Sequence, residues 1–262
     1  MVEPLSVDEI RRLFAVADED AARRLARRFA GDEREGVRAL VARARKQAKH
    51  SRVEDRRLDT MAVWQEELHA AGHVIVAGVD EVGRGALAGP LTACAIILPV
   101  DVRIRGLDDS KAIIPPRRVE LAQEISGVAT AFSVAHIEPS DIDAMGMTAA
   151  NRAVMRAAIA GLGVSVDHVL VDGIDDHLGM SCTAVIDGDA KVACIAAASI
   201  VAKVTRDALM VALDERYPGW GFGQHKGYST PEHKRCIDQI GLSPIHRRSF
   251  SPCAQLELFD LD

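Results

Sequence analysis

The sequence predicts an α/β domain, a mixed sheet flanked by helices, preceded by a small region made entirely of helices. From residue 73 onward, short continuous apolar runs of strand length are interspersed with helical patterns, which indicates a sheet with helices on its faces. The first 70 residues carry helical patterns alone. The 262 residues are 48% hydrophobic and 27% charged, values that fit one large domain with an appendage and exclude a disordered or collagen-like chain.

Residues 1–70 are expected to form the helical N-terminal extension. Ser6-Val-Asp-Glu9 has the pattern of a capping box ahead of an amphipathic helix, and residues 18–30 repeat the amphipathic pattern. A longer helix, without proline and with a highly charged surface, is predicted from about residue 32 to 69. Gly72 then supplies a plausible helix stop. The arginines of this region could contact a nucleic-acid backbone, but a solvated helix face is the favoured interpretation.

Residues 71–252 are expected to form the α/β domain, with residues 253–262 as a C-terminal tail. Strands are predicted from apolar runs at 74–79, 91–98, 128–134, 168–171 and 182–186. Helices are predicted between and after these runs at 117–125, 149–160, 195–213 and 231–240.

Composition narrows the class of protein. No apolar run reaches the roughly 18 residues of a membrane span, and the first residues lack the pattern of a signal peptide. The five cysteines include no C-x-x-C pair, so neither a disulfide framework nor a structural zinc site is indicated. We therefore expect a reduced, cytoplasmic protein that makes no contact with a membrane.

Charge is distributed unevenly along the chain. Residues 1–70 hold 15 basic and 14 acidic side chains, whereas the remainder holds 17 basic and 24 acidic ones. An acidic body does not exclude a nucleic-acid substrate, because bound divalent cations reverse the sign of a carboxylate-lined site.

Two adjacent carboxylates, Asp80 and Glu81, follow the first apolar run. An unpaired charge is costly beside such a run, and neighbouring side chains of a regular strand point to opposite faces. For both to reach one site the strand must end or bend there, and Gly83 and Gly85 supply that freedom. A strand end with a solvated acidic turn explains these two residues equally well.

Further acids follow later strands. Asp172 ends the run at 168–171, and Asp189 follows the run at 182–186. Four carboxylates delivered to one edge of a sheet would make an oxygen-rich site suited to Mg²⁺ or Mn²⁺, and such clusters support two-metal phosphoryl transfer.

Other known chemistries are poorly represented. The chain has no P-loop and no nucleophile elbow, and Gly83–Gly89 misses the dinucleotide-binding pattern by one residue. His225 and His233 flank Tyr228 with a spacing that fits no zinc signature, so we expect them to be surface histidines.

Several segments, in order, resemble type 2 ribonuclease H, the ribonuclease HII family. The resemblance covers about residues 73–252, and the helical region resembles the N-terminal extension of some bacterial members. The segments that carry it are Asp80-Glu-Val-Gly-Arg-Gly85 with Gly89-Pro90, Leu107-Asp-Asp-Ser-Lys111, Val171-Asp-Gly173, Gly188-Asp189, Ala197-Ala-Ser-Ile-Val-Ala-Lys203-Val-Thr-Arg-Asp207, His225-Lys-Gly-Tyr-Ser-Thr-Pro-Glu-His233 and Ser243-Pro-Ile-His-Arg-Arg-Ser-Phe250.

The resemblance implies a ribonuclease-H-like fold and a role for each matching residue. Hydrolysis would fall on the RNA strand of RNA–DNA hybrids and 5′ of ribonucleotides embedded in duplex DNA, by two-metal-ion catalysis with Mn²⁺ or Mg²⁺, leaving 3′-OH and 5′-phosphate. The implied metal-binding catalytic residues are Asp80, Glu81, Asp172 and Asp189. The implied substrate-binding residues are Gly83, Arg84, Gly85, Lys111 and Tyr228, while Arg206 and Asp207 are expected to be mainly structural.

The match has departures. Asp187 stands where the family often has a lysine, and this extra charge is expected to raise the pKa of Asp189 or alter metal preference. Type 3 ribonuclease H has a similar site but lacks the Gly83-Arg-Gly85 sequence. A metal-dependent nuclease or phosphatase without a ribose requirement, and a nucleic-acid-binding module, remain the alternatives.

The C-terminal residues form a separate feature. Gln255-Leu-Glu-Leu-Phe259 resembles the short peptide by which bacterial replication and repair proteins bind the sliding clamp. Gln255, Leu256, Leu258 and Phe259 would be its contacts. The alternative is that Leu256 and Phe259 fold back onto the domain.

Overall fold

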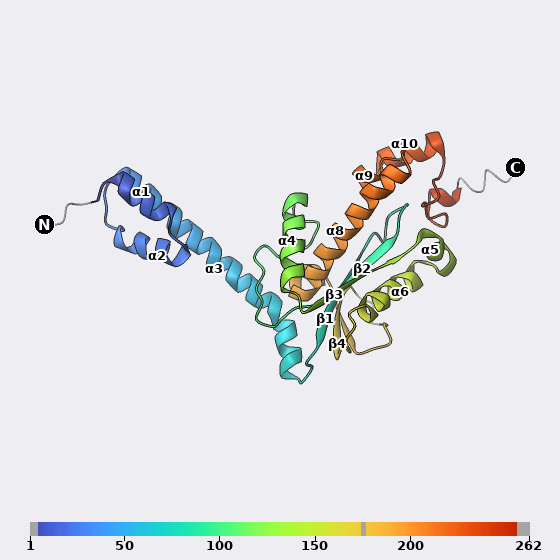
Figure 1. Cartoon of the computed structure of the whole chain (residues 1–262), viewed down its shortest axis with the longest axis horizontal. Coiled ribbons are helices and arrows are strands. Elements are labelled where there is room, and N and C mark those ends of the chain that lie inside the picture. The colour runs from blue at the N-terminus through green and yellow to red at the C-terminus, as the bar shows by residue number, and fades with distance from the viewer. Residues whose placement is uncertain (1–4, 174–176, 256–262) are drawn as a thin grey trace. The chain divides into compact units, whose positions relative to one another are not determined.

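The computed structural model describes residues 5–173 and 177–255, drawn as the coloured ribbon of Figure 1. The chain divides into two compact units, Met1–Asp59 and Thr60–Asp262. This division falls inside the third helix, whereas the predicted boundary after residue 70 coincides with the end of that helix. None of the described helices is both long enough and apolar enough to cross a membrane.

The first unit contains α1 (Val7–Ala15), α2 (Glu19–Arg28) and the first part of α3 (Glu35–Ala70). Ser6 and Glu9 form the predicted capping box, with Glu9 N–H donating to Ser6 Oγ at 3.2 Å. Asp18 caps α2 in the same way by accepting a hydrogen bond from the Ala21 N–H. A small apolar core joins the three helices, with Ile10, Ala26, Val37 and Val41 buried.

The second unit is built on a five-stranded mixed sheet, as predicted. Its strands are β1 (Val76–Val82), β2 (Leu91–Ile97), β3 (Ala131–Ile137), β4 (His168–Asp172) and β5 (Cys182–Val185). Their order is β3-β2-β1-β4-β5, in which β1, β2 and β3 are antiparallel neighbours while β4 and β5 run parallel to β1.

Two strands differ from their predicted positions. β1 runs on through Asp80 and Glu81, because these residues pair with Cys94 and Ala93 of β2 and stay in the ladder. The third strand lies three residues later than predicted, because α4 (Pro115–Val128) continues to the residue where the apolar run begins. An apolar run alone does not separate the last turn of a helix from a strand.

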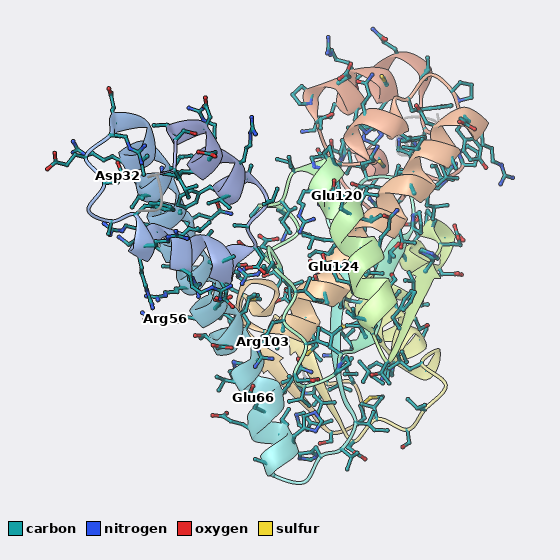
Figure 2. All side chains as sticks on the ribbon, turned by 60° about the vertical axis from the view of Figure 1, so that its left-hand side comes forward. Asp32, Arg56, Glu66, Arg103, Glu120 and Glu124 are labelled. Atoms are coloured by element: carbon teal, nitrogen blue, oxygen red, sulfur yellow. The ribbon has the colours of Figure 1, made fainter. Side chains whose placement is uncertain are left out.

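The remaining helices cover the sheet or close its ends. They are α5 (Pro139–Met145), α6 (Met147–Ala160), α7 (Gly188–Lys191), α8 (Ala193–Arg216), α9 (Phe222–His225) and α10 (Pro231–Ile240). Figure 1 shows α6 and α8 beside the sheet, and both pack on β1 and β2. An ion pair of 2.7 Å between Glu66 of α3 and Arg103 joins two further segments of this unit (Figure 2).

Alternation along β1 assigns α6 and α8 to opposite faces of the sheet. Val79 belongs to the apolar cluster that includes Val154 and Ala158 of α6. A Cβ added at Gly78 would lie 2.3 Å from the backbone of Cys194, so α8 packs closely against the face of the sheet to which Gly78 belongs. Side chains two residues apart in a strand share a face, so Asp80 lies on the α8 side and Glu81 on the α6 side.

Candidate active site

The end of β1 presents Asp80 and Glu81 to one cavity from two faces. Asp80 is buried, with 5% of its surface exposed, and Glu81 is partly buried. Both line a cavity of about 420 Å³ that we call the acidic cavity. The prediction that the strand must end or bend here is wrong, because both residues stay paired with β2 and both still line the cavity.

Asp172 and Asp189 come from the two parallel strands beside β1. Asp172 is the last residue of β4, and Asp189 lies in the short helix α7 that follows β5. The Oδ1 atom of Asp172 accepts hydrogen bonds from the N–H groups of Gly188, at 2.7 Å, and Asp189, at 3.4 Å. This pairing fixes the start of α7 against the end of β4 and brings Asp189 to the cavity.

Three of the four predicted carboxylates form one cluster. Asp80, Asp172 and Asp189 each offer an oxygen atom, and these atoms lie within 4.8 Å of one another. Glu81 is not in this group, but it lines the acidic cavity together with Asp80 and Asp172. A hydrogen bond from Asn151 and the guanidinium of Arg84, 3.8 Å from Glu81, hold this fourth carboxylate beside the cluster.

Burial and the proximity of like charges raise the pKa values of the carboxylic acids in this cavity. The pKa of Asp80 lies well above its ordinary value because of burial and because of the neighbouring charges of Glu81 and Asp172. Burial also raises the pKa of Glu81, and burial together with Asp172 raises that of Asp189. A nearby cation would relieve this repulsion, and Lys111 lies 3.5 Å from Asp189.

The cluster fits a hard divalent cation. Its donors are carboxylate oxygens from three separate backbone segments, which is the ligand chemistry that Mg²⁺ and Mn²⁺ prefer. Buried like charges are costly without a counterion, so the raised pKa values and the short oxygen separations both favour binding of a cation.

The acidic cavity gathers nearly all of the predicted site residues. Asp189 contributes through the carboxylate cluster, while the cavity lining supplies the other eight. Those eight are Asp80, Glu81, Gly83, Arg84, Gly85, Lys111, Asp172 and Tyr228. Ser110, Ser199 and Lys203 also line it, although no role at the site was predicted for them.

Two buried arginines hold the loop that follows β1. Arg206 is fully buried and donates to the carbonyl oxygens of Pro90, Lys226 and Ala88. Arg247, also fully buried, donates to the carbonyl oxygens of Gly89 and Arg84. The structural role predicted for Arg206 is therefore confirmed.

The two glycines of this loop have different reasons to be glycine. Gly83 has a φ of +91°, and an added Cβ would lie 2.2 Å from Nε of Arg206. At Gly85, by contrast, an added Cβ would meet no described atom within 4 Å. The space beside Gly85 is therefore open to a substrate rather than filled by the protein.

Tyr228 has two cations close to its ring at the cavity wall. Lys203 Nζ is 5.5 Å and the Arg206 guanidinium 5.4 Å from the centroid of its ring. Residue 228 also forms an isolated bridge with Ala86, which joins its loop to the glycine loop. Asp207 pairs with Lys203 at 2.7 Å and with Arg118 at 3.6 Å, consistent with its expected structural role.

The prediction that His225 and His233 are surface residues is wrong. Both are buried and, with His246, they support the Tyr228 loop. The Ser243 N–H donates to Nδ1 of His246, the Nε2 atoms of His246 and His233 lie 3.0 Å apart, and Nδ1 of His233 lies 3.0 Å from the Tyr228 carbonyl oxygen. Because that carbonyl only accepts, the chain of bonds requires both rings to be neutral.

Burial depresses the basicity of the histidines in this chain. It lowers the pKa of both His233 and His246 to about 4, and the nearby His225 ring adds to the effect at each. The histidines thus serve as a neutral scaffold, and nothing in their spacing along the chain indicated that they are buried.

Asp187 does not perturb Asp189 as expected. The pKa of Asp189 is raised, but burial, Asp172 and Asp109 are the causes. The Asp187 side chain is 71% exposed and pairs with Lys191 at 3.2 Å. Its charge is therefore directed to solvent and away from the cluster.

Comparison with known proteins agrees with this geometry. A family model described as Ribonuclease HII matches residues 77–253, and one described as Ribonuclease HII N-terminal domain matches residues 6–69. The chain belongs to the ribonuclease HII family. Members of this family are endonucleases that cleave the RNA of RNA–DNA hybrids and use divalent metals.

Individual relatives extend over most of the chain. The Ribonuclease HII of Geobacillus thermodenitrificans is 44% identical over 221 residues, which cover 84% of this chain and 85% of the relative. The Ribonuclease HII of Desulfitobacterium hafniense strain Y51 is 39% identical over 247 residues, covering 94% and 95% respectively. The second match covers so much of the chain that it takes in most of the helical extension as well as the catalytic unit.

Solved structures support the fold of the catalytic unit. The crystal structure of ribonuclease H2 from Pyrococcus horikoshii OT3 superposes with a TM-score of 0.62 at 29% identity, covering 71% of this chain and 99% of that one. An RNase HII from Archaeoglobus fulgidus, solved as a PCNA:RNase HII complex, gives 0.59 at 27% identity and covers 68% and 96%. Bst-RNase HIII in complex with Mn²⁺ gives 0.53 at 16% identity, a likeness of fold alone.

Proposed function

We propose that this ribonuclease HII cuts the phosphodiester on the 5′ side of ribonucleotides embedded in duplex DNA, as well as within RNA–DNA hybrids, and leaves 3′-OH and 5′-phosphate ends. One observation carries the proposal. The carboxylate cluster shares a single cavity with Gly83-Arg-Gly85 and Tyr228, so groups able to cleave a phosphodiester lie beside groups able to contact a sugar.

Asp80, Glu81, Asp172 and Asp189 would hold divalent cations, Mn²⁺ or Mg²⁺, at this site. Two such ions, when bound, supply an activated water and charge stabilisation at the leaving oxygen. Around them the protein contributes cations of its own. The Lys111 side chain is 78% exposed, so its ammonium can move from Asp189 to a substrate phosphate without any buried contact being broken.

Ribose recognition would come from the open side of the glycine loop. The space beside Gly85 admits a close approach of sugar to backbone, which is how a protein senses a 2′-hydroxyl. Tyr228 presents its ring next to this loop and is held by the buried histidines through its carbonyl. Arg84, whose side chain is 60% exposed, is available for a phosphate contact.

The deciding experiment compares two duplexes of identical sequence, one with a single embedded ribonucleotide and one entirely of DNA, each with Mn²⁺, Mg²⁺ or no added metal. We expect one cut, 5′ of the ribonucleotide, that depends on metal, and no cut in the DNA control. Cutting of both duplexes would favour a nuclease without a ribose requirement. Cutting of neither, with binding retained, would favour a nucleic-acid-binding module.

We also propose that the C-terminal residues bind a sliding clamp, which would deliver the enzyme to newly replicated DNA for ribonucleotide excision. Gln255 is described and exposed, whereas Leu256, Leu258 and Phe259 lie outside the described residues. The Archaeoglobus fulgidus relative was solved bound to PCNA, which supports a clamp as the partner. Cys253 is buried against Leu87 and Ile237, so the tethered segment would begin after it.

Clamp binding is testable with the intact enzyme. Wild type should bind an immobilised bacterial sliding clamp, and the Leu258→Ala/Phe259→Ala variant should not, because a short peptide relies on a few apolar anchors. Cleavage of the ribonucleotide-containing duplex without clamp should be equal in the two proteins. Equal clamp binding by both proteins would end this part of the proposal.

A further inference from the structure

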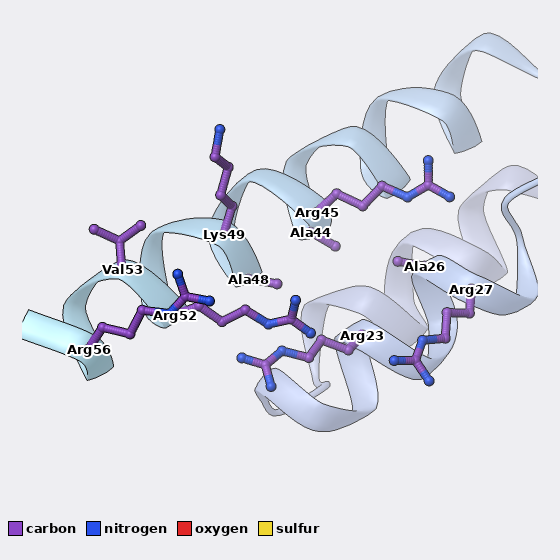
Figure 3. A pocket seen from close by; sticks show the side chains of 10 residues that line it. All are labelled: Arg23, Ala26, Arg27, Ala44, Arg45, Ala48, Lys49, Arg52, Val53 and Arg56. Atoms are coloured by element: carbon purple, nitrogen blue, oxygen red, sulfur yellow. The ribbon is translucent and has the colours of Figure 1, made fainter. Parts of the chain in front are cut away.

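The first unit contains a cavity that the catalytic chemistry does not use. It has a volume of about 420 Å³ and lies between α2 and α3, with every lining residue inside Met1–Asp59. The apolar residues that line it have small side chains, chiefly Ala26, Ala44 and Ala48 (Figure 3). Six cationic side chains line the rest, and we call this feature the basic cavity: Arg23, Arg27, Arg45, Lys49, Arg52 and Arg56.

The cations form two rows because of their helical spacing. Arg45, Lys49, Arg52 and Arg56 follow one another at intervals of four, three and four residues, which places them on one face of α3. At about 1.5 Å of rise per residue this row spans roughly 17 Å. Arg23 and Arg27, four residues apart, supply the opposite wall from α2, as Figure 3 shows.

Most of these cations lack an acidic partner. Within the described part of the chain, Arg27, Arg45, Lys49 and Arg52 make no ion pair with a carboxylate. Other arginines of the same unit do, namely Arg11 with Asp8, Arg34 with Asp32 and Arg57 with Glu54. Of the lining cations, Arg23 pairs with Glu19 and, at 3.5 Å, with Asp20, both in the first turn of α2.

The sequence shows the same segregation. Residues 36–53 contain six lysines and arginines and no acidic residue, although residues 1–70 as a whole are nearly balanced. Like charges gathered on adjacent helix turns oppose folding slightly, so their arrangement gives the unit no stability of its own. An anionic ligand would turn that repulsion into attraction.

We propose that the basic cavity binds the phosphodiester backbone of a nucleic-acid duplex and reads neither ribose nor base. The exposed row of cations on α3, with the exposed Arg27 of α2 opposite it, fits an extended polyanion, and the small alanine floor lets phosphates approach both helices. The cavity would give the enzyme a second hold on its substrate, separate from the acidic cavity. That the duplex is the enzyme's own substrate rests on the proposed function, whereas the phosphate chemistry does not.

The test uses the full-length enzyme and two variants of equal charge. The first, Arg45→Gln/Lys49→Gln/Arg52→Gln, removes three cations of the basic cavity. The second, Arg24→Gln/Arg38→Gln/Lys46→Gln, removes three exposed cations from the same helices that do not line the cavity. Binding to labelled all-DNA and hybrid duplexes is measured by fluorescence anisotropy with EDTA present, over a range of salt concentrations.

We expect the cavity variant to bind both duplexes at least tenfold more weakly, with a log–log salt slope smaller by roughly 2 to 3, since each lost phosphate contact removes about 0.9 from the slope. The control variant should stay within about twofold of wild type. Turnover at saturating substrate should be unchanged, with a raised KM. Should the triple variant lose helical content, Lys49→Gln alone provides the same comparison at smaller amplitude.

Equal weakening in both variants would overturn the proposal in favour of diffuse charge, and so would unchanged binding in the cavity variant. A loss confined to the hybrid would overturn it as well, because it would mean that the cavity reads ribose. Failure of the proposed function is seen separately, as wild-type enzyme that does not cut the ribonucleotide-containing duplex, because the binding measurement needs no cleavage.

Discussion

The two units of this protein gather like charges in opposite ways. The catalytic unit buries Asp80 and Asp189, which are 5% and 7% exposed, until their oxygens lie within 4.8 Å of Asp172. The first unit spreads Arg45, Lys49 and Arg52 along an exposed helix face. Burial at fixed short distances selects a small dense cation, whereas an exposed row suits a long polyanion and is screened by salt.

Arginine itself differs between the two units. Arg206 and Arg247 are fully buried, and their donors are used by backbone carbonyls of the loop that carries Gly83. Arg45 and Arg52 are exposed and make no ion pair in the described part of the chain. A buried arginine therefore holds a loop in place, whereas an exposed arginine without an ion pair remains available to bind a ligand.

The largest expected effect tests the buried side of this comparison. Asp80→Asn should lower turnover at least ~10³-fold, because it removes a ligand charge while keeping the shape of the side chain. Without metal, its melting temperature should equal or exceed that of wild type, since burial and Glu81 already oppose the charge. Asp187→Asn is the matched control, because Asp187 is exposed and paired with Lys191, and its turnover should change less than twofold. Near-normal turnover in Asp80→Asn would show that Asp80 is not a metal ligand.

The second prediction contrasts a buried arginine with an exposed one. Arg206→Gln should lower the free energy of unfolding by about 3 kcal/mol, since three backbone carbonyls lose their donor. Arg52→Gln, in the basic cavity, should change it by less than about 0.5 kcal/mol. Urea unfolding of both variants measures the difference. Similar values for the two would mean that the loop does not depend on Arg206.

The third prediction concerns acid and the histidines. The pKa values of His233 and His246 are lowered to about 4, so the stability they allow is complete above pH 6.5 and is lost as the pH falls toward 4. Between pH 7 and pH 5 each histidine should account for a loss on the order of 2 kcal/mol. The raised pKa values of Asp80 and Asp189 act in the opposite direction, because their repulsion fades on protonation.

The histidine contribution can be isolated. The Trp220 ring lies 6.3 Å from His246, and replacing Trp64 by Phe leaves Trp220 as the single tryptophan and a local reporter of unfolding. In that background His246→Gln should show a smaller loss between pH 7 and pH 5 than the parent. An identical pH dependence in the two proteins would place the acid sensitivity elsewhere.

The smallest expected effect sharpens the division between ribose sensing and phosphate binding. Tyr228→Ala should reduce discrimination between ribonucleotide-containing and all-DNA duplexes about tenfold. Overall duplex affinity should change less, because it depends mainly on contacts to phosphates. Affinity for all-DNA duplex should stay within about twofold of wild type. Tyr228→Phe separates the ring from its hydroxyl. An equal fall in affinity for both duplexes would make the tyrosine a general contact.

The sequence by itself determined the elements that depend on neighbours in the chain. Ser6 begins its helix as the capping pattern predicts, because a cap bonds to an N–H only three residues away, and Asp18 caps the next helix over the same short distance. The strand at 91–97 and the helix at 231–240 were likewise predicted within a residue. The motif order also identified the family and the carboxylates, although it did not show how Glu81 stands apart from the cluster.

Tertiary structure decided the features that depend on distant residues. Pairing with β2 keeps Asp80 and Glu81 in regular strand, so they reach one cavity from opposite faces without a bend. The burial of His233 and His246 depends on a bond between residues 13 positions apart, and Arg247 finds its acceptors 158 and 163 positions away. The basic cavity likewise exists because α2 packs on α3. Local sequence patterns determine helix caps and the periodicity of helices and strands. Whether a charged side chain is buried or exposed depends on tertiary contacts between distant segments, so only the folded structure decides it.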